Sequence, residues 1–282
     1  MLHGGCLFEQ NTNYRKRRKP QPSPQERSRF VRFRTAYTFE RFIALPRDDE
    51  LRILDFGAGQ GNSVSVLLEM YPNARFACAD IATTYLAELK TRFGSDARVQ
   101  IVEMSHSTDT AKLASDYDIV QLNAVFEHLF PLERKVLMPD LWRRLRVGGY
   151  PVLTETPWRW FPIETHTTSL SFVNYLPDRL ALVAARYCGR LPKTVTWEDA
   201  LRCGVRGGTY DEILSCIGAP ASTLERVDPQ AADARDMLEV WWRGEARKTS
   251  MKALTYHALR SFHRLTGALI SPWVNFVLRK LA

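Results

Sequence analysis

Asp55-Phe56-Gly57-Ala58-Gly59-Gln60-Gly61 follows an apolar run that ends in Ile53-Leu54 and precedes a helical pattern near Val64. A buried strand, a glycine-rich turn and a helix N-terminus in this order are typical of a site for an adenosyl ligand. Glycine lets the backbone turn sharply and approach a ligand where a Cβ atom would intrude. The spacing is D-x-G-x-G-x-G, and Asn62 stands where a dinucleotide fingerprint has its third glycine. The turn therefore argues against a dinucleotide cofactor.

Apolar runs and helical patterns alternate on both sides of this turn. The alternation predicts an α/β fold with a doubly wound, mostly parallel sheet and helices on both faces. The predicted strands are at about 51–56, 74–80, 98–103, 117–122 and 150–155, and the predicted helices are at about 61–70, 83–93, 109–114 (short) and 131–145.

The rhythm changes after the fifth strand. Residues 156–208 carry many aromatic side chains and prolines, which indicate a helical and aromatic insertion that covers the substrate side of the sheet. A helix is expected at 210–217, a sixth strand at 224–227 and a second, helical insertion at 231–265. Residues 273–280 fit either a last strand or a basic, aromatic helix suited to a membrane surface. The strand is favoured because Val, Phe and Trp cluster there.

The N-terminal region is strongly basic. Residues 1–25 are expected to be a flexible leader, and residues 26–282 one domain that begins with a helix near 26–45. Much of the net charge of +8 lies between residues 15 and 34. Such an arm is either simply solvated or attracted to anionic membranes or phosphate-bearing substrates. Nucleic acid is a less favoured partner, because few aromatic residues are interleaved with the arginines.

Other bulk features indicate a cytoplasmic protein, with peripheral contact to an anionic membrane as a further expectation. No apolar run approaches the roughly 18 residues of a membrane-spanning helix, and the N-terminus lacks the apolar core of a secretion signal. The five cysteines form no C-x-x-C pair, so free thiols are expected. The sequence makes no prediction of oligomeric state.

Residues at the ends of the first three strands are the candidates for cofactor binding. Asp80 ends the second strand, 21 residues after Gly59, where a carboxylate accepts hydrogen bonds from ribose hydroxyls. Asp55 is expected to order the glycine turn or to hold the amino end of the ligand. Ile81 and Met104 are expected to contact the adenine ring.

Titratable residues at the end of the fourth strand are the candidates for catalysis. Glu127 and His128 are adjacent, and a histidine with a pKa near 6.5 can act as a general base. The alternative is that Glu127 caps the next helix and His128 packs over the turn. His166 of the insertion would complete a carboxylate–imidazole group able to hold a metal ion. The spacing is not diagnostic, and the prediction is that no metal is bound.

These residues resemble a known family. Residues 53–61, Asp80, Phe126-Glu127-His128-Leu129 and residues 145–149 look like motifs of class I S-adenosylmethionine-dependent methyltransferases. The resemblance covers roughly residues 50–156 and is closest to the branch that includes the ubiquinone-pathway O-methyltransferases. It implies a seven-stranded sheet whose last strand is antiparallel, and S-adenosyl-L-methionine as cofactor.

The resemblance also implies roles for individual residues. Around the methionine part of the cofactor it places Asp55, Gly57, Gly59 and Gly61, and it places Asp80 at the ribose. Asn123 and Phe126 would lie near the sulfonium or the adenine. Members of the ubiquinone branch have a metal-binding glutamate where this chain has Ala124, which argues against metal-assisted chemistry here.

The expected function is methyl transfer, and O-methylation in particular. The acceptor is expected to be a small molecule or one linked to a lipid or glycan, because the insertion is aromatic and the leader basic. Two alternatives remain at this point: a non-catalytic methyltransferase-like binding module, and a nicotinamide-dependent oxidoreductase. Asn62 and the absence of a Tyr-x-x-x-Lys pair argue against the second.

Overall fold

The computed structural model describes residues 24–81, 84–227, 237–244, 249–267 and 270–282. The basic leader, predicted at 1–25, therefore lies almost entirely outside the described residues. The division into this leader and a domain at 26–282 stays a prediction. Among the described residues no helix is long and apolar enough to cross a membrane.

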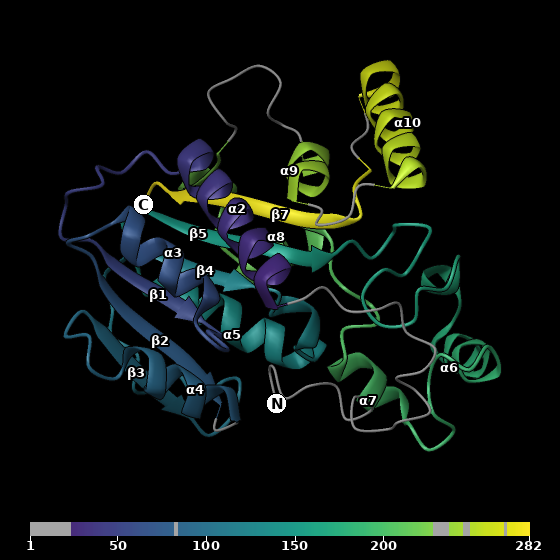
Figure 1. The fold of residues 1–282 in the computed structure, drawn as a ribbon, viewed down its shortest axis with the longest axis horizontal. Helices are drawn as coiled ribbons and strands as arrows, with labels where there is room; N and C mark the ends of the chain where they lie inside the picture. Colours follow the sequence, from purple (N-terminus) through teal and green to yellow (C-terminus); the bar gives the residue numbers. More distant parts are fainter. Residues whose placement is uncertain (1–23, 82–83, 228–236, 245–248, 268–269) are drawn as a thin grey trace.

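Seven strands form one sheet in the order β3-β2-β1-β4-β5-β7-β6 (Figure 1). The pairs among the first five strands are parallel, whereas β7 runs antiparallel to both β5 and β6. This confirms the predicted fold class. The strand bounds are β1 Arg52–Phe56, β2 Arg75–Ile81, β3 Val99–Met104, β4 Tyr117–Asn123, β5 Leu145–Pro157, β6 Leu224–Arg226 and β7 Trp273–Lys280.

Helices cover both faces of this sheet, each over its own hydrophobic cluster. On one face lie α2 (Pro24–Phe42), α3 (Asn62–Met70) and α4 (Thr84–Phe93), which share a buried cluster with Ile53 and Phe76. On the other face lie α5 (Pro131–Arg143) and α8 (Tyr210–Ile217), whose apolar side chains pack with Leu54 and Leu122. Because successive strand residues point to opposite faces, both clusters come from the same strands.

The insertion after β5 has its own small core. It contains η2 (Val173–Tyr175), α6 (Asp178–Tyr187) and α7 (Trp197–Arg202), which lie beyond the carboxyl edge of the sheet (Figure 1). Its buried residues are Ala185, Leu191, Val195, Ala200, Cys203 and Val205. Arg206 is buried and donates to Asp178 at 2.7 Å and to backbone carbonyls around η2. This arginine therefore ties the insertion together.

The C-terminal part follows the sequence expectations closely. The helix expected at 210–217 is present, and residues 273–280 form a strand. Two helices, α9 (Met237–Gly244) and α10 (Ser250–Thr266), occupy the described parts of the predicted helical insertion. A last short 3-10 helix, η3, spans Ala221–Thr223.

Two expectations were wrong. The short helix near 109–114 is absent, because the Asp109 carboxylate accepts hydrogen bonds from the backbone and hydroxyl of Ser105 and closes turns instead. Free thiols throughout were also expected. Cys78, Cys188 and Cys216 are free, but Cys203 is disulfide-bonded.

The third glycine of the turn is required by packing. Gly61 has a φ of +71°, and a Cβ atom there would stand 2.5 Å from the Phe93 ring and 2.6 Å from Leu89 of α4. Gly148 has a similar φ of +81°, but a Cβ atom on it would have no neighbour within 4 Å. Adding a Cβ atom at Gly61 would cause both backbone strain and overpacking, whereas adding one at Gly148 would cause backbone strain alone.

We predict that Gly61→Ala lowers the free energy of unfolding by about 2–5 kcal/mol, from backbone strain plus overpacking. Gly148→Ala is the control and should lose only about 1–2 kcal/mol, the cost of the left-handed backbone alone. Urea denaturation followed by circular dichroism measures both. Equal losses for the two variants would show that α4 does not press on the turn.

Candidate active site

The glycine turn is tied to the end of β2 by the Asp80 carboxylate. The backbone N–H of Gly59 donates to Oδ2 of Asp80 at 2.6 Å, and the N–H of Ile81 donates to Oδ1 at 2.7 Å. The N–H groups of Gly57 and Ala58 donate to the carbonyl of Ala79. The turn therefore lies at the carboxyl ends of β1 and β2. The strand order reverses between β1 and β4, where sheets of this kind bind their ligands.

Asp80 keeps the capacity to bind a ribose. A carboxylate offers about four lone-pair positions, and the two amide donors use two of them. The side chain is fully buried, so further hydrogen bonds there are made away from bulk water. The residues present thus fit an adenosyl ligand. Asp80 at the end of β2 has acceptor positions left for it, and Gly57, Gly59 and Gly61 of the turn all have positive φ.

Asp55 lies at the end of β1 on the side of the sheet that faces α3. Its Oδ2 accepts a hydrogen bond from the Ser63 hydroxyl at 2.7 Å, and Gln121 of β4 lies 3.5 Å from Oδ1. Burial raises the pKa of Asp55 to about 7, the nearby Asp80 charge adds to this, and the Ser63 hydrogen bond opposes it. A cationic ligand beside Asp55 would favour its ionised form.

Helix α2 covers the neighbouring strand ends. Arg34 of α2 forms an ion pair with Glu155 at 2.7 Å, and both side chains are largely buried. Glu155 follows a register shift in β5, has a φ of +63° and points toward the helix. A narrow cavity lies under α2, and its lining includes Arg34, Thr38, Phe39, Gln121, Asn123 and Glu155. Asn123 accepts a hydrogen bond from Thr154 at 3.1 Å, so the predicted residue is on the wall of this cavity.

Glu127 and His128 lie in the 3-10 helix η1 (Phe126–His128), directly after β4. Glu127 is buried, and Thr156 donates to its Oε2 at 3.2 Å, while Oε1 has no hydrogen-bond partner in the described structure. Burial raises the pKa of Glu127 to about 8, although hydrogen bonds and the Arg134 charge oppose the shift. The alternative that Glu127 caps α5 is wrong, because Glu133 holds the N-terminus of that helix.

The tautomer of His128 follows from its partner. Its Nδ1 lies 2.8 Å from the carbonyl oxygen of Arg202, which can only accept a hydrogen bond. Nδ1 therefore carries a proton, and Nε2 is the basic nitrogen of the neutral ring. Nε2 lies 3.9 Å from Oε1 of Glu127. The raised pKa of Glu127 keeps this acid mostly protonated near pH 7, and a positive charge on the imidazole would favour the carboxylate, which could then stabilise that charge.

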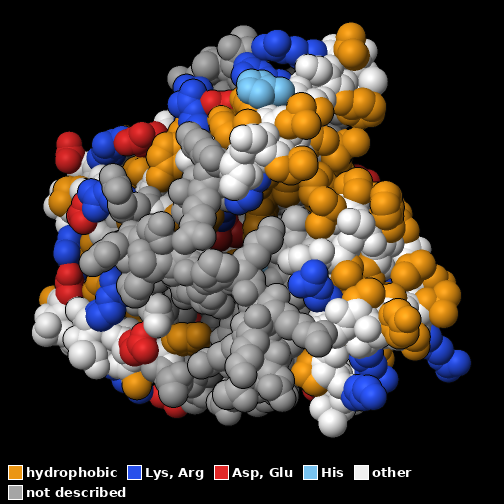
Figure 2. Space-filling view, turned by 45° about the vertical axis from the view of Figure 1, so that its right-hand side comes forward, with side chains coloured by type: hydrophobic (Ala, Val, Ile, Leu, Met, Phe, Trp, Pro, Cys, Tyr) orange, Lys and Arg blue, Asp and Glu red, His pale blue; other side chains and the backbone are white. Residues whose placement is uncertain are grey.

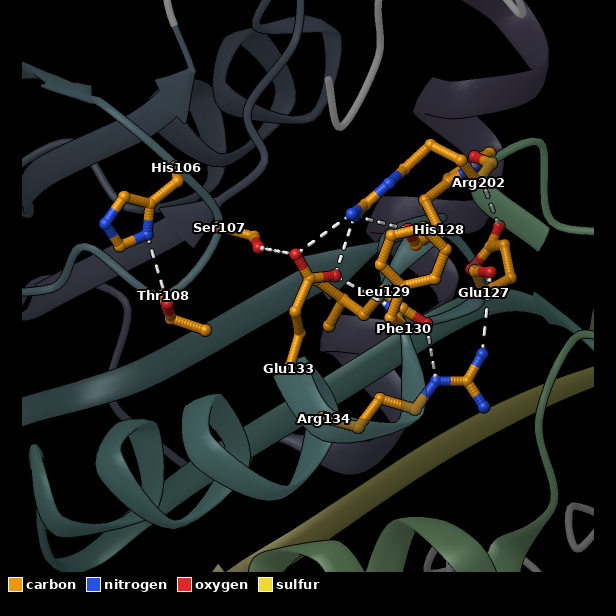
Figure 3. A network of polar contacts seen from close by, with 10 residues as sticks. All are labelled: His106, Ser107, Thr108, Glu127, His128, Leu129, Phe130, Glu133, Arg134 and Arg202. Atoms are coloured by element: carbon orange, nitrogen blue, oxygen red, sulfur yellow. Dashed lines mark hydrogen bonds and ion pairs between the residues drawn. The ribbon is translucent and has the colours of Figure 1, made fainter. Parts of the chain in front are cut away.

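Two arginines fix this short helix in place (Figure 3). Arg202 of α7 donates to the carbonyl of His128 and to both carboxylate oxygens of Glu133. Arg134 of α5 donates to the carbonyls of Leu129 and Gly207, and its guanidinium lies 4.3 Å from the Phe126 ring centroid. Sequence reasoning missed both, because several of their partners lie far away in the sequence, up to 78 residues, and leave no local pattern.

His166 joins this group from the insertion. One ligand atom each of Glu127, His128 and His166 lies within 4.8 Å of the others, so the three residues considered together from the sequence do meet. The His128 and His166 rings are in edge contact, with centroids 5.2 Å apart. The set could ligate a cation, but Ala124 offers no further ligand.

The remaining predicted residues are spread around the same edge. Ile81 is partly buried beside Asp80, whereas Met104 and Phe126 are fully packed in the cluster under α5. Phe126 lies against Gly208, where a Cβ atom would stand 2.7 Å from the ring. Their contacts with a cofactor stay predictions. Ser63 and Arg34 were missed, since a hydroxyl in a first helical turn and one arginine among many carry no distinct signal.

The sheet is parallel except for β7, and Asp80 binds the glycine turn at its carboxyl edge. Together these features define a site for a cofactor that contains a nucleoside. Residues 53–149 match a protein family described as a methyltransferase domain. The chain is 28% identical over 200 residues to trans-aconitate 2-methyltransferase from Azoarcus sp., covering 69% of this chain and 75% of that protein. It is 31% identical over 97 residues to a malonyl-[acyl-carrier protein] O-methyltransferase from Acetivibrio thermocellus, covering 34% of this chain and 33% of that protein.

Among solved structures, a protein described as a sarcosine dimethylglycine methyltransferase from Galdieria sulphuraria has the same fold. The TM-score is 0.50 at 13% identity, over 91% of this chain and 86% of that one. Residues 53–149 are therefore a methyltransferase domain, of the kind that takes its methyl group from S-adenosylmethionine. Neither curated relative is named as a ubiquinone-pathway enzyme, so the resemblance holds for the class and not for that branch. The two alternatives, a non-catalytic module and a nicotinamide enzyme, are set aside.

We predict that Asp55 makes the ligand-free protein less stable as the pH rises. Its pKa is about 7 in the folded protein and near 3.8 in the unfolded chain, so the folded state holds a proton that the unfolded state has lost. Stability from this group is therefore full below about pH 4 and falls as the pH rises toward 7. Asp55→Asn should flatten this part of the dependence of melting temperature on pH.

Thermal unfolding at several pH values checks this, with Asp109→Asn as the control. Asp109 is a partly exposed acid whose pKa is lowered by its Ser105 hydrogen bonds, so its removal should not flatten the same slope. If Asp55→Asn and the parent protein keep parallel curves between pH 4 and 7, Asp55 does not hold the proton.

Proposed function

We propose that the protein transfers a methyl group from S-adenosyl-L-methionine to an oxygen atom of a small-molecule acceptor. The observation that carries the proposal is the pair of hydrogen bonds from Gly59 and Ile81 to Asp80. They place a buried carboxylate with spare acceptor positions beside a turn of positive-φ glycines. Each of these features suits an adenosyl group held at the end of a strand.

Roles for the surrounding residues follow from their positions. Asp80 would accept hydrogen bonds from the ribose hydroxyls, and Ile81 and Met104 would flank the adenine. Asp55, Gly57, Gly59 and Gly61 would surround the methionine part, with Asp55 facing its ammonium group. Asn123 and Phe126, at the end of β4, would lie nearest the sulfonium. The Asp55 assignment is supported by its burial, because a buried carboxylate gains most from a cationic partner.

The bound cofactor supplies a methyl group whose carbon–sulfur bond breaks, with its electron pair going to sulfur, as the acceptor oxygen attacks. The protein's main task is to align that oxygen and exclude water, which is worth effective molarities of roughly 10⁵–10⁸ M. His128 would remove the acceptor's proton through Nε2. The neighbouring Glu127 carboxylate would stabilise the resulting imidazolium, and the Arg202 carbonyl would hold the ring in orientation.

The acceptor would enter between the sheet edge and the insertion. An acceptor linked to a lipid or glycan fits the aromatic side chains there, and Trp160 and Tyr175 stack with centroids 6.1 Å apart. The insertion also favours an anionic group. Burial and the nearby Arg206 charge lower the pKa of Arg159 to about 10, so an anion beside these two arginines would relieve their repulsion. Both curated relatives are named after an acceptor that carries a carboxylate, trans-aconitate in one and a malonyl group in the other, which agrees with an anionic acceptor.

Calorimetry with S-adenosylhomocysteine tests the cofactor site. The parent protein should bind it and should not bind NADH. We predict that Asp80→Asn raises the Kd by about 10–100-fold, because hydrogen bonds to a charged acceptor are lost. Asp49→Asn, an exposed acid that precedes the amino end of β1, is the matched control and should leave the Kd unchanged. Absence of S-adenosylhomocysteine binding by the parent protein would refute the assignment.

Transfer of a radiolabelled methyl group to a panel of phenolic, sugar and carboxylate acceptors tests the base. We predict that His128→Gln lowers kcat by about 100-fold or more on a hydroxyl acceptor and removes the acid limb of its pH profile. Cofactor binding should survive. A loss below tenfold, as expected for an acceptor that is already ionised, would contradict the role of His128.

Dialysis against EDTA is the control for metal at Glu127, His128 and His166. Our proposal needs no metal, because alignment and proton removal suffice for the displacement. Activity should therefore stay within about twofold, a change too small to represent loss of a Lewis acid that contributes several kcal/mol. Loss of activity that Mg²⁺ restores would instead assign these three residues to a cation.

A further inference from the structure

Helix α10 stands on the domain through one of its faces only. Thr249 caps its N-terminus, and Gly267 ends it in a left-handed conformation. Tyr256 is buried, stacks on Trp242 of α9 with centroids 5.2 Å apart, and donates a hydrogen bond to Glu239. Leu259 and Trp273 of β7 complete this contact. The helix is thus held in place by packing, independently of its opposite face.

The opposite face of α10 is an exposed apolar stripe. Met251, Leu254, Phe262 and Leu265 are 71%, 65%, 42% and 86% exposed, and Ala258 between them is exposed as well. Their spacing of three or four residues places them along one side of the helix, away from Tyr256. Burying side chains of this size is favourable, so a stripe of them left in water indicates an interaction surface.

The charge on α10 is of one sign. The helix contains Lys252, Arg260 and Arg264 together with His257 and His263, and it contains no aspartate or glutamate. An apolar stripe on a helix whose charged residues are all basic is the pattern of helices that lie in the headgroup region of an anionic bilayer. A second copy of the helix is a poorer partner, because α10 carries no acidic residue and so offers its basic residues no opposite charge.

A second exposed apolar group lies on the same side of the molecule. Leu180, Val183 and Tyr187 of α6 form a stripe at helical spacing, and Trp160, Phe172 and Tyr175 form an exposed aromatic group in the insertion. Figure 2, which turns this side forward, shows hydrophobic side chains gathered on the face that carries α6 and α10, with Lys and Arg side chains among them. Trp and Tyr are the aromatic residues favoured at a membrane–water interface.

We infer that the apolar stripe of α10 binds the surface of a bilayer containing anionic lipids, with the helix lying in the interface. The carboxyl edge of the parallel strands faces the same side as α6 and α10 (Figure 1). A membrane bound there would present a lipid-linked acceptor to the active site. The binding itself does not depend on methyl transfer, so it is tested without cofactor or acceptor.

The experiment is flotation of the full-length protein with two kinds of vesicle, phosphatidylcholine alone and phosphatidylcholine with phosphatidylglycerol at about three to one. The protein should float with the anionic vesicles and much less with the neutral ones. The double variant Leu254→Glu and Phe262→Glu should lower the bound-to-free ratio by more than about tenfold, because it removes two apolar anchors and adds two repelled carboxylates.

The matched control is Leu132→Glu with Val136→Glu on α5. These side chains are 76% and 59% exposed, and they lie four residues apart on α5. The control therefore adds the same two charges to exposed apolar positions outside α10. The control should float like the parent protein. Circular dichroism and S-adenosylhomocysteine binding establish that both double variants are folded, and a failure of cofactor binding in the parent protein would bear on the proposed function alone.

Three results would overturn the inference. The stripe is not a membrane anchor if the α10 variant floats as well as the parent protein. If deletion of residues 1–23 then abolishes flotation, those residues cause the binding instead. Equal binding to neutral and anionic vesicles would remove the role of the basic residues. Absence of flotation, together with a dimer in sedimentation that the α10 variant loses, would assign the stripe to a second copy of the chain.

Discussion

The Asp80 carboxylate holds the ends of β1 and β2 together, and the geometry of the cofactor site depends on it. One of its two amide donors, Gly59, belongs to the turn after β1, and the other, Ile81, is the last residue of β2. A turn with three positive-φ glycines has little conformational preference of its own. The carboxylate supplies the missing constraint from one side, and the packing of Leu89 and Phe93 against Gly61 supplies it from the other.

A second set of constraints joins β4 to the insertion. The helix η1 packs Phe126 into the core, and Arg134 and Arg202 hold its backbone through carbonyl oxygens and through the partly buried carboxylate of Glu133. Both arginines also stack on aromatic rings, Arg134 over Phe126 and Arg202 over Phe130. Guanidinium groups suit this task because they present several donors in one plane. Movement of the insertion would therefore be felt directly at His128, whose ring is bonded to the Arg202 carbonyl.

Buried acids mark the region between these two sets of constraints. Asp55 and Glu127 are both buried, and burial raises the pKa of each. Such groups weaken the folded state at neutral pH unless a ligand compensates for them, and they are commonly found at functional sites for that reason. Under the proposed function, the ammonium and sulfonium groups of the cofactor and a protonated His128 would supply compensating positive charge. The site is thus better suited to the loaded enzyme than to the empty one.

Much of the fold followed from local patterns. Strand bounds agreed within about two residues for β1 to β4, where the apolar runs are short and each begins beside a charged residue. The helix at 210–217 and the strand at 273–280 were also predicted. The start of β5 was not, because Leu145 pairs with Tyr117 before a bulge at the double glycine, and pairing is a property of two segments. The turns at 109–114 were missed because one side chain, Asp109, outweighed a weak helical pattern.

The sequence by itself determined the class of ligand, since the D-x-G-x-G-x-G spacing and an acid 21 residues after Gly59 are local requirements of backbone geometry and ribose binding. It also placed Glu127 and His128 at the end of β4. Only the tertiary structure decided that His166 meets Glu127 and His128, that Arg34 closes over Glu155, and that one face of α10 is left exposed. These features depend on contacts between residues tens of positions apart. The sequence did not predict them because a short-range pattern does not show which distant segments meet in the folded chain.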